Sequence, residues 1–282
     1  MSSVQTEHGY AKSGGARIYY EIAGHGTPLV MIHAGVADSR QWNNEFPYFA
    51  EQYKVLRYDM RGYGKSEPVE GEFSHMSDLV TLLDQVRLTD PLILMGCSMG
   101  GGLAMDFALA YPKRARALIM VDAGPGGLDL DLPSPPEFAE AEEAFKAGDL
   151  DRVAELETRI WFDGLSRTPG QVDQAMRQLA YDMDRHALSL EARGLGKRVP
   201  NSPTPAAERL GELNLPVLII VGAHDTPYMH AAADYMLERI PSAQKAVIEA
   251  AAHLPNMDRP EEFRSIVEGF LGKQAAKADE AH

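Results

Sequence analysis

The sequence predicts an α/β fold, with a mostly parallel central sheet flanked by helices and an inserted helical cap. Short apolar runs alternate with segments of helical periodicity along the first half of the chain. This alternation favours parallel strands joined by helices that cover both faces of the sheet. It stops after Gly124-Pro125 and resumes at 215–223. The stretch between is therefore predicted to be an insertion into one domain.

The chain opens with two β-prone segments within residues 8–23, separated by Gly14-Gly15. Paired glycines tolerate the positive φ of a tight turn, so we expect a hairpin here. Six apolar runs then predict buried strands: LVMIH (29–33), KVLRYDM (54–60), PLILMGC (91–97), RALIMVDA (116–123), LPVLIIVGA (215–223) and KAVIE (245–249). Helical patterns separate or follow them, as in SDLVTLLDQVRL, MGGGLAMDFALAYP, HAAADYMLERI and PEEFRSIVEGFL.

The predicted insertion covers residues 126–209, which are acidic, interrupted by proline and helical in pattern. Its clearest helical segments are EFAEAEEAFKAG and DRVAELETRIWF. Residues 1–125 and 210–272 are then expected to form the core beneath this cap. Residues 273–282 are charged and rich in alanine, and we expect a flexible tail there.

Composition excludes several classes of partner. The chain has 282 residues with 27 basic against 41 acidic side chains, and no stretch concentrates lysine and arginine as nucleic-acid binding requires. The apolar runs are far shorter than the ~20 residues that span a bilayer. The polar start lacks the apolar core of a signal peptide, and the single cysteine, Cys97, rules out an intramolecular disulfide. We expect a cytoplasmic protein without nucleic-acid or membrane partners, and homo-oligomerisation stays open.

The strongest chemical signal is Gly96-Cys97-Ser98-Met99-Gly100, a G-x-S-x-G between an apolar run and a helix start. The chain must turn sharply from strand to helix at the serine, and this context supports a nucleophile on a strained turn. The flanking glycines leave room where a β-carbon would crowd that turn. We therefore predict Ser98 as the nucleophile and regard Cys97 as a small packing residue.

A serine hydroxyl needs an adjacent base that is held in the right tautomer. In the chain order that accompanies this turn, the base follows the last strand, where His253 lies in AAAHLPNMDRP. The acid should follow the preceding strand, and Asp225 comes directly after LIIVGAH. Asp122, at the end of RALIMVDA, is the rival, because a carboxylate there could also reach the base. We favour Asp225.

The tetrahedral intermediate needs two hydrogen-bond donors for its developing oxyanion. The backbone N–H of Met99, at a helix N-terminus, is predicted to be one of them. The second is expected in the loop His33-Ala34-Gly35-Val36. His33 itself stands at the strand end, before a glycine, where a loop-stabilising role suits it better than catalysis.

Taken together, these residues resemble the α/β-hydrolase superfamily, in its capped esterase, enol-lactonase, haloperoxidase-like and C–C hydrolase branch. The likeness covers roughly residues 17–272 apart from the cap. It rests on HAGVADSRQW (33–42), DMRGYGKS (59–66), GCSMGG (96–101), GAHD (222–225) and AAHLPNMDRPEEF (251–263). The family often has His-Gly-x-Pro at the first motif, so the register implies Gly35 as the second oxyanion donor. Asp59, Arg61 and Ser66 correspond to family positions that are mainly structural.

The resemblance disfavours haloalkane dehalogenases and epoxide hydrolases, which look similar but place an aspartate where this chain has Ser98. It implies a serine hydrolase that cleaves an ester or lactone of a small, largely apolar molecule through an acyl-enzyme, without metal or organic cofactor. Trp161 and Phe162 of the cap are candidates to line the substrate pocket. Three alternatives stay open: a C–C bond hydrolase, a cofactor-free perhydrolase or haloperoxidase, and a ligand-binding receptor on the same scaffold.

Overall fold

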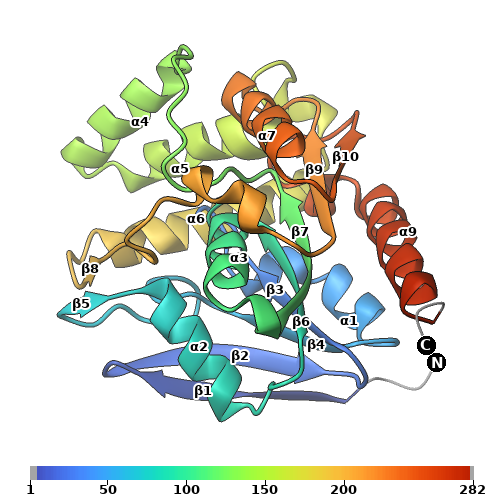
Figure 1. The fold of residues 1–282 in the computed structure, drawn as a ribbon. Coiled ribbons are helices and arrows are strands. Elements are labelled where there is room, and N and C mark those ends of the chain that lie inside the picture. The colour runs from blue at the N-terminus through green and yellow to red at the C-terminus, as the bar shows by residue number, and fades with distance from the viewer. Residues whose placement is uncertain (1–4, 280–282) are drawn as a thin grey trace.

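The computed structural model describes the backbone of residues 5–279 and the side chains of residues 5–274. An eight-stranded sheet lies at its centre, in the order β1-β2-β4-β3-β6-β7-β9-β10 (Figure 1). Its strands are β1 (Thr6–Ser13), β2 (Ala16–Ala23), β3 (Pro28–Ile32), β4 (Lys54–Tyr58), β6 (Leu92–Cys97), β7 (Ala115–Val121), β9 (Val217–Gly222) and β10 (Ala243–Ile248). Strand β2 runs antiparallel to both neighbours, and the pairs from β4 to β10 are parallel. The predicted hairpin and the six predicted strands are confirmed.

Helices cover both faces of this sheet, as the alternating pattern predicted. Helices α2 (His75–Gln85), α3 (Met99–Ala110) and α7 (Pro227–Arg239) pack on one face, and α1 (Glu45–Phe49), α8 (Pro255–Asp258) and α9 (Pro260–Asp279) on the other. Successive side chains of a strand point to opposite faces. Accordingly, Val30 and Ile32 of β3 join the apolar layer under α2 and α3, whereas Leu29 and Met31 join the layer under α1 and α9.

A group of three helices is inserted between β7 and β9, at the top of the view in Figure 1. They are α4 (Pro136–Ala147), α5 (Leu150–Thr158) and α6 (Gln174–Glu191), with a π-helical turn at Arg159–Asp163. A second, two-stranded sheet pairs β5 (Glu72–Phe73) with β8 (Lys197–Arg198) and joins the end of the insertion to the core. Short 3₁₀ turns lie at Ser39–Trp42, Pro112–Arg114, Pro169–Gln171, Ala206–Glu208 and Leu210–Glu212.

The predicted domain limits can be placed on these elements. All eight strands of the main sheet fall within 1–125 and 210–272, and α4, α5, α6 and β8 fall within 126–209. Helix α9 continues to Asp279, through residues 273–279 of the predicted tail, and 280–282 lie outside the described residues.

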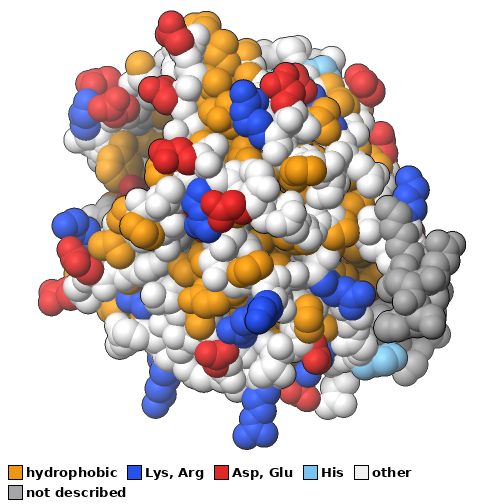
Figure 2. Space-filling view, viewed as in Figure 1, with side chains coloured by type: hydrophobic (Ala, Val, Ile, Leu, Met, Phe, Trp, Pro, Cys, Tyr) orange, Lys and Arg blue, Asp and Glu red, His pale blue; other side chains and the backbone are white. Residues whose placement is uncertain are grey.

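The surface is mixed in charge. On the face drawn in Figure 2, basic and acidic side chains lie interspersed, with apolar atoms between them. No helix in the described part of the chain combines the length and the apolar character needed to cross a bilayer.

Candidate active site

Four neighbouring strands bring four polar side chains to one edge of the sheet. Ser98 follows β6, Asp122 follows β7, Asp225 lies three residues after β9, and His253 lies in the loop after β10. These strands are consecutive in the sheet order and parallel. Since parallel strands end at the same edge, residues far apart in sequence converge there, the usual place for sites in such sheets.

Ser98 occupies the strained turn that the motif predicts. Its φ is +51°, in the left-handed region that residues with a β-carbon seldom adopt. A β-carbon at Gly96 would lie 2.3 Å from the carbonyl oxygen of Gly100, and one at Gly100 would lie 2.5 Å from that of Ile32. Both glycines are therefore required by close backbone approach. The turn makes Ser98 the residue before α3 and places it in the wall of a cavity of about 560 Å³.

His253 and Asp225 form a buried pair. The Nδ1 atom of His253 lies 2.6 Å from Oδ2 of Asp225, and their side chains are 3% and 0% exposed. The other carboxylate oxygen of Asp225 accepts a hydrogen bond from the N–H of Thr226. Burial opposes ionisation of Asp225, but the charge and hydrogen bond of His253 outweigh it and hold the pKa of the carboxyl below its usual value. With Nδ1 facing the carboxylate, Nε2 of His253 is left to act as the base.

The rival acid, Asp122, lies in the same cluster. Its carboxyl, that of Asp225 and a ring nitrogen of His253 lie within 4.8 Å of one another. Both of its oxygens face the N–H of Gly222, at 2.9 and 3.2 Å. Burial, followed by the charge of Asp225, raises the pKa of Asp122 well above its usual value. The three groups are close enough to hold a metal ion, yet the nitrogen of His253 nearest Asp225 is already hydrogen-bonded to it.

The peptide of His253 is fixed beside the nucleophile turn. The thiol of Cys97, the residue before Ser98, donates to the carbonyl oxygen of His253 at 3.4 Å. Within the described residues, no hydrogen bond joins the hydroxyl of Ser98 to His253. Catalytic contacts of this kind are often long in unliganded enzymes and shorten in the substrate complex.

The predicted oxyanion donors also come together. A side chain at Gly35 would touch that of Met99 at 3.7 Å, so the two residues are neighbours. The N–H of Ala34 is already bonded to the side chain of Gln41, at 2.9 Å. Met99 is the first residue of α3, where N–H groups have no partner within the helix. This arrangement is compatible with Gly35 and Met99 as the donors, which stays a prediction.

His33 has the loop-stabilising position that was expected. Its Nε2 accepts a hydrogen bond from the N–H of Met60, and its Nδ1 lies 2.7 Å from the carbonyl oxygen of Ala34. Burial lowers the pKa of His33, so the ring is neutral, and one nitrogen can donate while the other accepts. The ring thereby ties the loop after β3 to the loop after β4.

Comparison with known proteins identifies the family. Residues 29–266 match the model of the Alpha/beta hydrolase family. The chain belongs to this family. A pimeloyl-[acyl-carrier protein] methyl ester esterase of Aeromonas hydrophila is 30% identical over 256 residues, covering 89% of this chain and 98% of that protein. A 2-hydroxy-6-oxononadienedioate/2-hydroxy-6-oxononatrienedioate hydrolase of Cupriavidus pinatubonensis is 27% identical, covering 91% of each chain.

Solved structures agree with this assignment. The crystal structure of bromoperoxidase from Bacillus anthracis superposes with a TM-score of 0.77 at 28% identity, over 94% of this hydrolase and all of that chain. The predicted fold and the predicted enzyme class are therefore confirmed: this chain is an α/β-hydrolase, and its relatives are esterases and other hydrolases.

The cap of this hydrolase contacts the predicted base directly. The ring of Trp161 lies 4.4 Å from that of His253, and the carbonyl oxygen of Trp161 accepts from the N–H of His253 at 3.0 Å. Phe162 is fully buried in the apolar layer shared with α1 and α9. Both residues line a small void beside Val36, and neither lines the cavity at Ser98. Their role as pocket residues stays a prediction, whereas the contact of Trp161 with the base was not foreseen.

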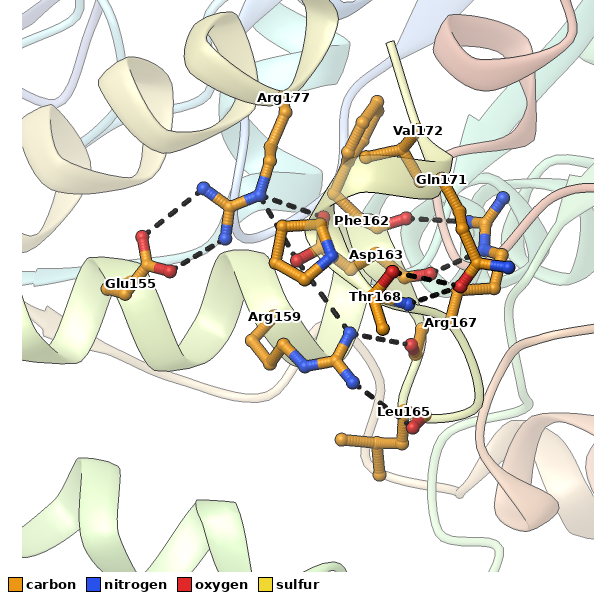
Figure 3. A network of polar contacts seen from close by, with 12 residues as sticks. Glu155, Arg159, Phe162, Asp163, Leu165, Arg167, Thr168, Gln171, Val172 and Arg177 are labelled. Atoms are coloured by element: carbon orange, nitrogen blue, oxygen red, sulfur yellow. Dashed lines mark hydrogen bonds and ion pairs between the residues drawn. The ribbon is translucent and has the colours of Figure 1, made fainter. Parts of the chain in front are cut away.

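Arginines hold the end of the π-helical turn Arg159–Asp163, at Phe162 and Asp163, as Figure 3 shows. This turn also carries Trp161. Arg177 of α6 bonds to Glu155 of α5 at 2.7 Å and to the buried carboxylate of Asp163 at 2.9 Å. Arg167 bonds to the carbonyl oxygen of Phe162 and, at 2.7 Å, to Asp258 of the core. The position of Trp161 over His253 is thus fixed from both the cap and the core.

A second cavity, of about 540 Å³, adjoins the first and includes Gly35 in its wall. His75 and Arg198 line both cavities. Arg198 belongs to β8, and its guanidinium contacts the sulfur of Met99. Neither residue was predicted from the sequence, because neither lies in a recognisable motif and Arg198 is positioned by the pairing of β8 with a distant two-residue strand.

Proposed function

We propose that this hydrolase cleaves an ester or lactone of a small, largely apolar substrate through an acyl-enzyme on Ser98. One observation carries the proposal: His253 is hydrogen-bonded to Asp225 at 2.6 Å, at the edge of the sheet where the left-handed turn presents Ser98. A nucleophile, a base and an acid brought together from three strand ends at one edge of a sheet are the arrangement that acyl transfer by a serine requires.

The chemistry follows from these positions. Nε2 of His253 takes the proton of the Ser98 hydroxyl while the serine oxygen attacks the substrate carbonyl carbon. The N–H groups of Gly35 and Met99 bind the oxyanion that forms. Collapse of the intermediate breaks the bond to the leaving oxygen, which receives the proton from His253. Water then attacks the acyl-enzyme with His253 as base again, and the acid product and free Ser98 are released.

One relative supports an ester as the bond that is cleaved, and two other similar proteins support the alternatives. The similar Aeromonas protein is named a methyl ester esterase, while the similar Cupriavidus protein is named a hydrolase of a 2-hydroxy-6-oxo dienoic diacid. C–C bond hydrolysis is the second candidate on that ground. The similar bromoperoxidase keeps cofactor-free perhydrolysis open in the same way. We further propose a cytoplasmic location, which the single buried thiol of Cys97 supports.

The test is a panel of p-nitrophenyl esters of rising acyl length, assayed with wild type and Ser98→Ala. We expect turnover of short and medium acyl esters, a decline for long chains because we expect the cap to limit acyl size, and no activation by emulsified substrate. Ser98→Ala should lower kcat on the order of a millionfold. Turnover by that variant within tenfold of wild type would refute the assignment. Turnover of a vinylogous 1,5-diketone in preference to every ester would select C–C hydrolysis.

A further inference from the structure

Asp122 is a buried carboxyl at the centre of the site that the proposed mechanism does not use. It directly follows β7, the strand that lies between the strand preceding Ser98 and the strand preceding Asp225. Its side chain is buried, its φ is +40°, and its own N–H bonds to the carbonyl oxygen of Ile220 at 2.8 Å. A residue held in this backbone conformation by the sheet has little freedom to turn its carboxyl away.

The groups that face Asp122 come from three elements. Cys97 of β6 contributes a buried thiol whose pKa burial raises well above the usual value, so it is neutral. The end of β9 contributes the N–H of Gly222, the loop after it contributes the carboxyl of Asp225, and the loop after β10 contributes His253. Among the ion pairs of the described residues, no lysine or arginine binds Asp122 or Asp225. The two carboxyls therefore share one neutral environment and one imidazole.

Two buried carboxylates this close cannot both be charged at little cost, so one of them keeps its proton. Asp225 is the ionised one, because it faces His253 at 2.6 Å and accepts from the N–H of Thr226. Asp122 is left as the acid, in agreement with the direction in which burial and Asp225 move its pKa. Its O–H then needs an acceptor, and the carboxylate of Asp225 is the adjacent group that offers one.

We propose that Asp122 is a positioning residue whose protonated carboxyl donates a hydrogen bond to Asp225, which orients that carboxylate toward His253 and moderates its charge. The inference rests on the proposed function of Ser98, Asp225 and His253. A proton held at Asp122 makes the hydrogen bond a fixed part of the resting enzyme. Asp122 touches no substrate and acts through Asp225 alone.

The test compares Asp122→Asn, which keeps a donor at this position, with Asp122→Ala, which removes it. The readout is the pH profile of kcat/KM for p-nitrophenyl butyrate, whose acidic limb reports protonation of the catalytic base. Asp122→Asn should keep activity within about threefold and leave the acidic limb in place. Asp122→Ala should lower kcat about tenfold with little change in KM, and move the acidic limb up by about half to one pH unit, because an unmoderated carboxylate favours the imidazolium.

Two outcomes would overturn the proposal. A downward shift of the limb in Asp122→Asn would mean that wild type carries a second negative charge there. An unmoved limb in Asp122→Ala would mean that the residue only supports the fold. The proton on Asp122 can be tested directly, without turnover, by infrared spectroscopy at neutral pH. The difference spectrum between wild type and Asp122→Asn should contain the C=O band of a protonated carboxylic acid. Absence of that band contradicts the proposal even if the proposed function holds.

Discussion

At Asp225, burial and hydrogen bonding act in opposite directions on one carboxyl group. Removal from water favours the neutral acid, and the contacts with His253 and Thr226 favour the carboxylate. The contacts prevail, so the charge is held next to the imidazole. Asp122, a few ångströms away, accepts from the N–H of Gly222, but burial and the charge of Asp225 outweigh that hydrogen bond and raise its pKa. The pKa of the same residue type is thus moved in opposite directions at two neighbouring strand ends.

This difference predicts unequal effects of the same substitution. Asp225→Asn should lower kcat by about 10⁴-fold, because an amide favours the wrong tautomer of His253. Asp122→Asn is its matched control and should keep activity within about threefold. Both variants should retain wild-type circular dichroism, and kcat with a p-nitrophenyl ester is the measurement. If Asp122→Asn is the more damaging of the two, the acid has been assigned to the wrong strand.

Glu45 of α1 predicts a pH dependence of stability that is unconnected with catalysis. Its side chain is fully buried, and this burial raises its pKa to about 8. A hydrogen bond from Asn256 at 3.0 Å lowers the pKa but does not offset the effect of burial. The folded pKa lies above the unfolded value, so the folded state binds one more proton between about pH 4.5 and 8. The contribution of this carboxyl to stability is therefore largest at low pH and falls as pH rises to about 8, by roughly 1.4 kcal/mol per unit.

Glu45→Gln should remove that slope. The free energy of unfolding of wild type and Glu45→Gln is measured by urea titration at pH 5, 6.5 and 8. As pH rises, wild type should steadily lose stability relative to the variant. A difference that stays constant across this range would show that Glu45 ionises in the folded protein as it does in water.

At the residue scale, the sequence predicts backbone geometry where a motif constrains it. The strained turn at Ser98 could be predicted because glycines two positions away on either side suit one backbone conformation. That Ser98 is the nucleophile stays a prediction. The choice between Asp122 and Asp225 could be favoured but not decided, since both follow apolar strands. The structure distinguishes them by the hydrogen bond between Asp225 and His253, which lies 28 positions further along the chain.

The cap contacts the candidate site through its π-helical turn. Helical periodicity predicted helix up to Phe162, but the change to π geometry at Arg159–Asp163 has no simple sequence pattern. Such turns are often found at functional sites. Here the turn presents Trp161 to His253 while Phe162 packs inward. The pairing of β5 with β8 was equally beyond sequence analysis, because two-residue strands acquire their partners only in the folded chain.

Trp161 and Phe162 should therefore respond differently to truncation. Trp161→Ala should lower kcat/KM about tenfold by exposing the base to water, with a small change in stability. Phe162→Ala should destabilise the fold by about 3 kcal/mol, because it leaves a cavity in a buried layer. Urea unfolding and ester kinetics on both variants separate the two effects. Equal losses of stability would mean that Trp161 is a packing residue like its neighbour.

At the scale of the whole molecule, the alternation of strands and helices was enough to predict the class of fold and an insertion. That alternation did not predict the order of the strands within the sheet. This order is what brings the residues of the candidate site together. Strands β6, β7, β9 and β10 are adjacent although the cap separates β7 from β9 along the chain. Their adjacency brings a serine, two aspartates and a histidine together above one edge of the sheet.

The central claim is that Ser98 is the nucleophile activated by His253, and covalent labelling tests it most directly. Wild type, Ser98→Ala and His253→Ala are treated with a fluorophosphonate, and the adduct is located by peptide mass spectrometry. We expect a single adduct on the peptide that contains Ser98 in wild type, none in Ser98→Ala, and labelling of His253→Ala slowed by at least a thousandfold. An adduct on another residue of wild type, or labelling of Ser98→Ala at the wild-type rate, would contradict the account.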